Sequence, residues 1–127
     1  MVASLIDFPG ASEVIRGGIV AYSDEMKHTV VGVSQRTLDQ FTSISRECVE
    51  EMLILTQCKF ASDCCIALSG NAGPTGSDDQ PVGRVYIGVR VNERQAIHEM
   101  NYSEMTRNEL RQAVVQDASR FMLELIG

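Results

Sequence analysis

The last segment of the chain, residues 108–126, limits the possible folds more than any other feature. Its apolar residues follow one another at steps of four, four, three, one and three: Leu110, Val114, Ala118, Phe121, Met122 and Leu125. This spacing predicts a helix with one apolar face. Such a helix gains most of its stability by packing that face against another element, so the chain must supply a matching apolar surface.

Four segments are predicted to be β-strands. Residues 84–91 alternate apolar and polar side chains, which places Val85, Ile87, Val89 and Val91 on one face. Residues 96–102 are predicted to be its antiparallel neighbour. Residues 64–69 form a continuous apolar run, typical of a buried strand. Residues 19–22, between a glycine pair and Ser23-Asp24, are predicted to be a short buried strand.

Two serines are placed to begin helices. Ser34 is the predicted N-cap of a short helix reaching Phe41, and Ser45 that of a helix running to about Lys59. Strands that alternate with helices indicate an α/β fold, a three-layer α/β/α domain with a mixed, mostly parallel sheet. Sites in such sheets lie beyond the carboxyl ends of the strands. This rule points to residues 22–27 and to the loop that begins at Ser69-Gly70.

Length and charge narrow the class of protein. The chain has 127 residues, 44% of them hydrophobic, enough for one core, so we expect a single domain over residues 1–127. A net charge of −6 argues against binding to nucleic acid, which needs clustered Lys and Arg. The apolar runs are too short for a bilayer span, and the N-terminus does not resemble a secretion signal. We expect a cytoplasmic protein with no membrane partner.

Cysteine and histidine give no sign of a metal or redox centre. Cys64 and Cys65 are adjacent, and none of the four cysteines has Cys-x-x-Cys spacing. We expect all four to be reduced thiols, mostly buried. His28 and His98 are isolated from each other and from any carboxylate pattern with ligand spacing. Neither a metal nor a cofactor is expected.

Ser12, Tyr22, Ser23 and Lys27 offer a nucleophile and a base within a short stretch. A serine hydroxyl can attack an amide carbon if a neutral lysine accepts its proton. The same residues have plainer interpretations: Ser12 as a helix N-cap, and Lys27 as a surface lysine in the turn after a strand. The glycine-rich loop over residues 70–83 can bring backbone N–H groups to an anion, or it can be a solvent-exposed connection. It matches neither a Walker loop nor a dinucleotide fingerprint.

Taken together, the segments resemble a known family over most of the chain. They are Pro9-Gly10-Ala11-Ser12, Gly17-Gly18-Ile19-Val20-Ala21-Tyr22-Ser23-Asp24-Glu25-Met26-Lys27, Gly32-Val33-Ser34 with Thr37-Leu38, Ser43-Ile44-Ser45, Ser69-Gly70-Asn71-Ala72-Gly73-Pro74 and Pro81-Val82-Gly83-Arg84-Val85-Tyr86. This combination resembles the C-terminal domain of the competence/damage-inducible protein CinA. The pairing of Tyr-Ser-Asp-Glu-Met-Lys with Ser-Gly-Asn-Ala-Gly-Pro is far more specific than either part alone.

The resemblance implies an activity in pyridine nucleotide salvage. It implies that the carboxamide of nicotinamide mononucleotide is hydrolysed to nicotinic acid mononucleotide and ammonia, without a metal or cofactor. Ser12 matches the family's nucleophile, Lys27 its general base and Tyr22 an active-site phenol. The loop that lines the nucleotide pocket is matched by Gly70, Asn71, Ala72, Gly73 and Thr75.

Three departures from the family pattern bear on this expectation. Met1 to Asp7 matches only the helix that follows the family's first strand and its Glu-Ser-Cys-Thr-Gly-Gly segment, which indicates an N-terminally shortened member. Asn71 stands where a small or β-branched apolar residue is usual. The family's Gly-Asp-Arg before the last helix is replaced by residues 104–106, with Arg107 displaced by one place as the candidate phosphate contact. The alternative to an enzyme is a degenerate, non-catalytic nucleotide-binding or assembly domain.

A missing strand also leaves backbone groups or apolar surface without a partner. We therefore expect the chain to form a homo-oligomer.

Overall fold

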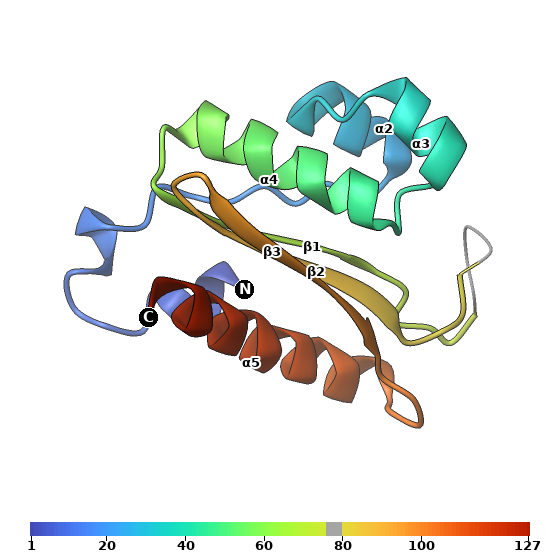
Figure 1. Cartoon of the computed structure of the whole chain (residues 1–127). Helices are drawn as coiled ribbons and strands as arrows, with labels where there is room; N and C mark the ends of the chain where they lie inside the picture. Colours follow the sequence, from blue (N-terminus) through green and yellow to red (C-terminus); the bar gives the residue numbers. More distant parts are fainter. Residues whose placement is uncertain (76–79) are drawn as a thin grey trace.

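The computed structural model describes residues 1–75 and 80–127 (Figure 1). The elements follow one another along the chain as α1 (Val2–Leu5), the 3₁₀ turn η1 (Ala11–Glu13), α2 (Asp24–Met26), the π-helical turn η2 (Lys27–Val31), α3 (Gln35–Phe41), α4 (Arg46–Phe60), β1 (Cys64–Gly70), β2 (Arg84–Val91), β3 (Arg94–Asn101) and α5 (Arg107–Ile126).

The three described strands form one sheet in the order β1-β2-β3, and both neighbouring pairs are antiparallel. The prediction of a mostly parallel sheet is therefore wrong for these strands. A parallel pair needs a long crossover between its strands. Here only the turn at Asn92-Glu93 separates β2 from β3, and no helix of the described residues lies between β1 and β2. β3 confirms the antiparallel neighbour predicted for β2.

The predicted strand over residues 19–22 is also wrong. This segment joins no ladder, and the side chains of Val20 and Tyr22 are 88% and 81% exposed. Ile19 and Ala21, which alternate with them, pack against the buried cluster of Val31, Val33, Leu38 and Cys48. The sequence has a strand-like alternation, but the described sheet consists of β1, β2 and β3 and does not include this segment.

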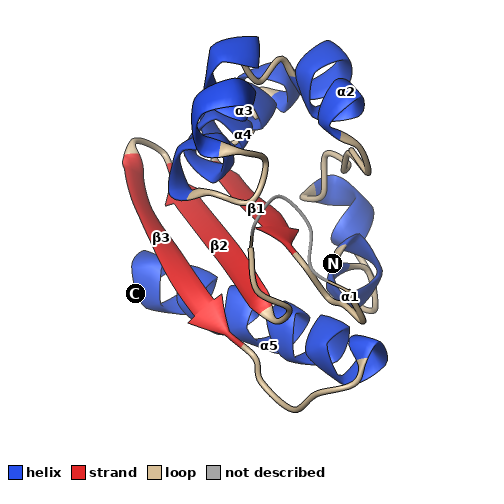
Figure 2. Cartoon of the chain, turned by 90° about the vertical axis from the view of Figure 1, so that its right-hand side faces the viewer, coloured by secondary structure: helices blue, strands red, loops and turns tan. Residues whose placement is uncertain are grey.

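Helices lie on both faces of the sheet (Figures 1 and 2). The face of β2 that carries Val85, Ile87 and Val89 packs against α5 through its buried stripe, which consists of Leu110, Val114, Ala118 and Phe121. The apolar faces predicted for residues 84–91 and 108–126 thus form one core. On the other face, α4 contacts all three strands.

Gly88 permits the close approach of α4 to the sheet. A Cβ atom at this position would lie 2.6 Å from Cγ1 of Val49 and 2.7 Å from Cδ1 of Leu53, both fully buried residues of α4. Any larger residue in the middle of β2 would therefore push the helix away from the strands.

The two helix starts predicted from serines are confirmed. The Ser34 hydroxyl accepts a hydrogen bond from the Thr37 backbone N–H, and the Ser45 hydroxyl accepts one from that of Cys48. α5 begins with a full capping box between Thr106 and Glu109. These caps satisfy backbone N–H groups that the first helical turn leaves without partners.

The two edges of the sheet differ in character. β3 presents charged residues along its length, including Arg94 and Glu99, and charged side chains of this kind discourage pairing with other chains. β1, with the sequence CCIALSG, carries no charged residue, and no described strand pairs with its outer side. None of the described helices is long and apolar enough to cross a membrane.

All four cysteines are free thiols, as predicted. Cys48 and Cys65 are buried, whereas Cys58 and Cys64 are exposed, so the prediction that the thiols are mostly buried is wrong. Burial raises the pKa of Cys48 and of Cys65 to about 11.

Candidate functional site

The loop after β1 begins with a buried amide side chain. Asn71 is 8% exposed, and its side-chain oxygen accepts a hydrogen bond from the backbone N–H of Gly73 at 3.0 Å. Its backbone is paired with Gly83 and Arg84 at the far end of the loop. The side-chain nitrogen Nδ2 is buried and has no hydrogen-bond partner among residues 1–75 and 80–127. A buried donor without a partner is uncommon, because desolvation makes it costly.

Arg107 joins this loop to the N-terminal part of the chain. Its Nη1 donates to the Gly73 carbonyl at 2.8 Å, and its Nη2 donates to the Tyr22 hydroxyl at 2.8 Å. Four of the residues predicted for the site, Tyr22, Asn71, Gly73 and Arg107, therefore form one connected cluster. We call it the Arg107 cluster.

Lys27 lies five positions after Tyr22, one of the residues of this cluster. Its backbone N–H donates to the carbonyl of Ser23, one turn earlier, and its side chain is half-buried. It begins the π-helical turn η2, a distortion that often occurs at functional sites. Lys27 lies close enough to Cys48 to lower the pKa of that thiol, although burial has the larger and opposite effect.

Ser12 lies at the other end of the molecule. It is exposed in the turn η1, whose N-cap is Gly10, so Ser12 is not a cap. Four residues later, Arg16 donates to the carbonyl of Ala61 at the C-terminal end of α4. Lys27, in contrast, lies close enough to Cys48 to affect the pKa of its thiol.

The twelve helical steps from Cys48 to Phe60 span about 18 Å along α4. Figure 1 shows η1 and α2 at opposite ends of that helix. One chain therefore does not bring Ser12 and Lys27 together.

A cavity of about 680 Å³ lies between the end of β1 and the first half of α5. The predicted residues Gly70 and Ala72 line it, together with Asn108 and Arg111 of α5. Sequence reasoning missed Arg111, although its position four residues after Arg107 puts both guanidinium groups on one side of the helix. Thr75, the last predicted residue of the loop, is exposed. Residues 76–79 of that loop lie outside the described part of the chain.

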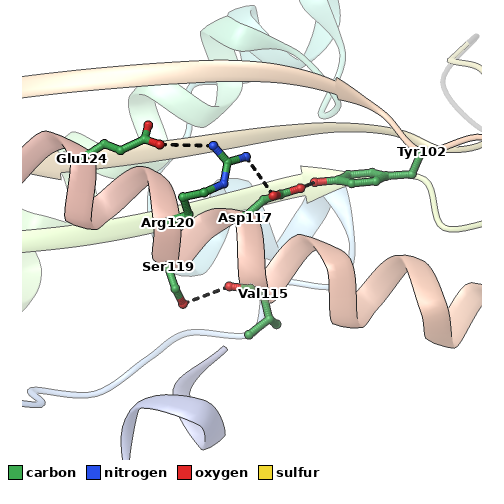
Figure 3. A network of polar contacts seen from close by, with 6 residues as sticks. All are labelled: Tyr102, Val115, Asp117, Ser119, Arg120 and Glu124. Carbon is green, nitrogen blue, oxygen red and sulfur yellow. Dashed lines mark hydrogen bonds and ion pairs between the residues drawn. The ribbon is translucent and has the colours of Figure 1, made fainter.

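A second network fixes the base of this loop to α5. The Tyr102 N–H donates to the Gly83 carbonyl at 2.8 Å, and the Tyr102 hydroxyl donates to Asp117 at 2.5 Å. Arg120 extends the network through ion pairs to Asp117 and Glu124 (Figure 3). Burial, and then the bond to Asp117, raises the pKa of Tyr102.

Burial alone would raise the pKa of Asp117, but the hydrogen bonds from Tyr102 and Arg120 lower it on balance. Within residues 1–75 and 80–127, His, Cys, Asp and Glu side chains form no group of three that could hold a metal ion.

Comparison with known proteins gives a consistent result. The family described as CinA C-terminal domain matches residues 1–126. Protein MG115 homolog of Mycoplasma pneumoniae is 40% identical over 114 residues, which cover 90% of this chain and 73% of that protein. A CinA-like protein of Thermotoga maritima is 42% identical over 95 residues, which cover 73% of this chain and 23% of that protein.

Solved structures share the whole architecture. The competence/damage inducible protein CihA from Agrobacterium tumefaciens superposes with a TM-score of 0.93 at 30% identity, covering 99% of this chain and 78% of that chain. Several curated relatives are much longer, since the chain spans only about a quarter of their length.

Proposed function

Because the chain belongs to the CinA C-terminal domain family, we propose that it is an amidase that hydrolyses the carboxamide of nicotinamide mononucleotide. The observation that carries this proposal is the Arg107 cluster. It joins the phenol of Tyr22 to the loop after β1, beside a cavity lined by a second cation, Arg111. Two guanidinium groups can bind a phosphate, and a phenol and the backbone N–H groups of a glycine-rich loop can bind the polar part of the same substrate.

In the proposed reaction, which requires an arrangement of the protein that brings Ser12 to Lys27, the Ser12 hydroxyl attacks the carboxamide carbon while Lys27, as a neutral amine, accepts its proton. The C–N bond then breaks, and the proton passes from Lys27 to the departing nitrogen, which leaves as ammonia. A water molecule next hydrolyses the acyl-serine ester, releasing nicotinic acid mononucleotide and restoring Ser12. Tyr22 and the backbone N–H groups of the loop are candidates to stabilise the oxyanion.

Substrate binding is assigned to the other predicted residues. Arg107 and Arg111 would hold the phosphate, because a planar guanidinium matches phosphate oxygens in a bidentate way. Asn71 would donate its Nδ2 to the substrate, which would satisfy a buried group that has no partner among the described residues. Gly70, Ala72, Gly73 and Thr75 would line the pocket without bulky side chains.

Ammonia release from nicotinamide mononucleotide tests the proposal. The wild type should release ammonia, whereas Ser12→Ala and Lys27→Ala should lower kcat by at least a hundredfold, since each removes one partner of the nucleophile–base pair. Arg107→Ala should mainly raise KM. Equal rates for the wild type and both catalytic variants would contradict the assignment.

The distance between Ser12 and Lys27 within one chain favours a second candidate, a non-catalytic nucleotide-binding domain. Calorimetry separates the two. Binding of nicotinamide mononucleotide without any ammonia release would support the second candidate, whereas binding with turnover would support the amidase.

A further inference from the structure

This inference rests on the proposed function and concerns how the loop after β1 is held in place for its ligand. The loop is joined to α5 at two places. Near its start, Arg107 donates to the Gly73 carbonyl at 2.8 Å. At its end, the Tyr102 N–H donates to the Gly83 carbonyl, and the Tyr102 hydroxyl donates to Asp117. Both ends of the loop are therefore attached to the same helix.

Hydrogen bonds of Asn71 connect these two attachments. The Asn71 carbonyl accepts from the Gly83 N–H at 2.8 Å, and its side-chain oxygen accepts from the Gly73 N–H at 3.0 Å. The Asn71 N–H donates to the carbonyl of Arg84, the first residue of β2, at 3.0 Å. A displacement of Gly83 would therefore move the Asn71 amide, which the proposed function places against the substrate.

Both carboxylate oxygens of Asp117 are engaged. Oδ2 accepts from the Tyr102 hydroxyl, and Oδ1 accepts from Nη2 of Arg120 at 2.9 Å (Figure 3). Arg120 is itself held by an ion pair with Glu124 at 3.2 Å, and its guanidinium carbon lies 4.6 Å from the centre of the Phe121 ring. Hydrogen bonds to a charged group are stronger than those between neutral groups. Asp117 thus offers Tyr102 an acceptor whose direction is fixed from two sides.

We infer that Tyr102 and Asp117 are positioning residues of the candidate site. They hold Gly83, and through it Asn71, where the loop meets the substrate. Binding groups keep a productive geometry only if the residues behind them are themselves held in place. Neither Tyr102 nor Asp117 is placed against the substrate, so their loss should weaken substrate binding and leave the hydrolytic step largely unchanged.

Hydrogen exchange tests whether the loop is held, and it needs no activity. In Tyr102→Phe and in Asp117→Ala, the backbone amides of Asn71 and Gly83 should exchange at least about threefold faster than in the wild type, because the loop opens locally more often. Loop amides that exchange equally fast in the wild type and in Tyr102→Phe would overturn the inference.

Gln57→Ala is the matched control for a general loss of stability. Gln57 donates to the carbonyls of Asp63 and Asn92, which lie at the end of the sheet opposite the loop. Its replacement removes hydrogen bonds without touching the loop, so exchange of the two loop amides should stay at the wild-type rate. Equal acceleration in Gln57→Ala and Tyr102→Phe would show a general effect and overturn the inference.

Steady-state kinetics with nicotinamide mononucleotide tests the consequence for binding. Tyr102→Phe and Asp117→Ala should raise KM by about three- to tenfold, while kcat stays within about twofold of the wild type. Asp117→Asn keeps an oxygen that can accept from the Tyr102 hydroxyl, so its KM should lie closer to that of the wild type. An unchanged KM in Tyr102→Phe would overturn the inference.

The double variant Tyr102→Phe/Asp117→Ala tests whether the two residues act as one unit. Both substitutions break the same contact, so the double variant should raise KM no more than the stronger single variant does. Effects that multiply would show independent roles and overturn the inference. A wild type that releases no ammonia, together with faster loop exchange in Tyr102→Phe alone among Tyr102→Phe and Gln57→Ala, would support the positioning role and count only against the proposed function.

Discussion

At the scale of single residues, Tyr102 connects more of the molecule than its position at the end of β3 suggests. Its backbone holds Gly83 at the base of the loop, and its hydroxyl reaches Asp117 on α5. The bond joins a neutral donor to a carboxylate, which makes it stronger than a bond between neutral groups. Tyr102 thereby ties the loop of the candidate site to the helix that carries Arg107 and Arg111.

We predict that Tyr102→Phe lowers the free energy of unfolding by about 1–2 kcal/mol, because it removes a hydrogen bond to a charged group and leaves the ring in place. Urea denaturation followed by circular dichroism measures the change. Tyr86→Phe is the matched control, since the Tyr86 hydroxyl has no hydrogen bond to the described residues and its loss should change stability by less than about 0.5 kcal/mol. Equal effects of the two substitutions would contradict the assigned role.

The same contact predicts a response to alkaline pH. The pKa of Tyr102 is raised in the folded state, so its contribution to stability is complete below the unfolded pKa of 10.0 and is lost as the pH rises above that value. Burial of Cys48 and Cys65 acts in the same direction above their ordinary pKa of 9.0. Unfolding free energies measured from pH 8 to 11.5 should therefore fall, and less steeply in Tyr102→Phe. Parallel curves for the two proteins would show that Tyr102 is not responsible.

At the scale of elements, the loop closes at a position that only glycine can occupy. Gly83 has φ +93°, and a Cβ atom there would lie 2.2 Å from the backbone oxygen of Tyr102. Gly83→Ala combines an unfavourable backbone conformation with a clash against main chain, and should destabilise the protein by at least about 2 kcal/mol.

Gly32→Ala isolates the cost of the unfavourable backbone conformation. Gly32 has φ +99°, but a Cβ atom there would make only an ordinary van der Waals contact, with Leu55 at 3.7 Å. It should cost about 1 kcal/mol. Midpoints of urea unfolding compare the two variants, and a Gly83→Ala protein as stable as Gly32→Ala would refute the clash.

Local sequence patterns predicted most of the helices and strands. The serine N-caps predicted α3 and α4, the alternation of apolar and polar residues predicted β2, and the apolar stripe predicted α5. Each of these patterns depends only on residues close together in the sequence. The sheet direction was predicted wrongly because it depends on which strands meet. The segment over residues 19–22 failed for the same reason, since a strand needs a partner that its own sequence does not specify.

The candidate site, like the fold, was predicted only in part from the sequence. The residues of the Arg107 cluster were predicted through resemblance, and their contacts join Tyr22 to Arg107 across 85 positions of sequence, which no local pattern reveals. Arg111 was missed because one arginine on a helix surface is usually solvated. The separation of Ser12 from Lys27 could not be foreseen either, because a gap of fifteen residues is compatible with both a turn and an extended path.

At the scale of the whole molecule, burial divides the thiols into two classes. We predict that Cys58 and Cys64 react quickly with a chromogenic disulfide reagent in the folded protein, whereas Cys48 and Cys65 react only on unfolding, because they are buried and their raised pKa leaves little thiolate. Titration with and without guanidinium chloride counts each class. Rapid reaction of all four thiols in the native state would show that the core opens readily.

The uncharged outer side of β1 affects how the protein behaves in bulk. No described strand pairs with the outer edge of β1, and backbone hydrogen bonds form whatever the side chains are, so this edge can pair with a strand of a neighbouring molecule. Crowding therefore favours polymers that grow strand by strand along the sheet, and seeds formed in a concentrated stock would survive dilution.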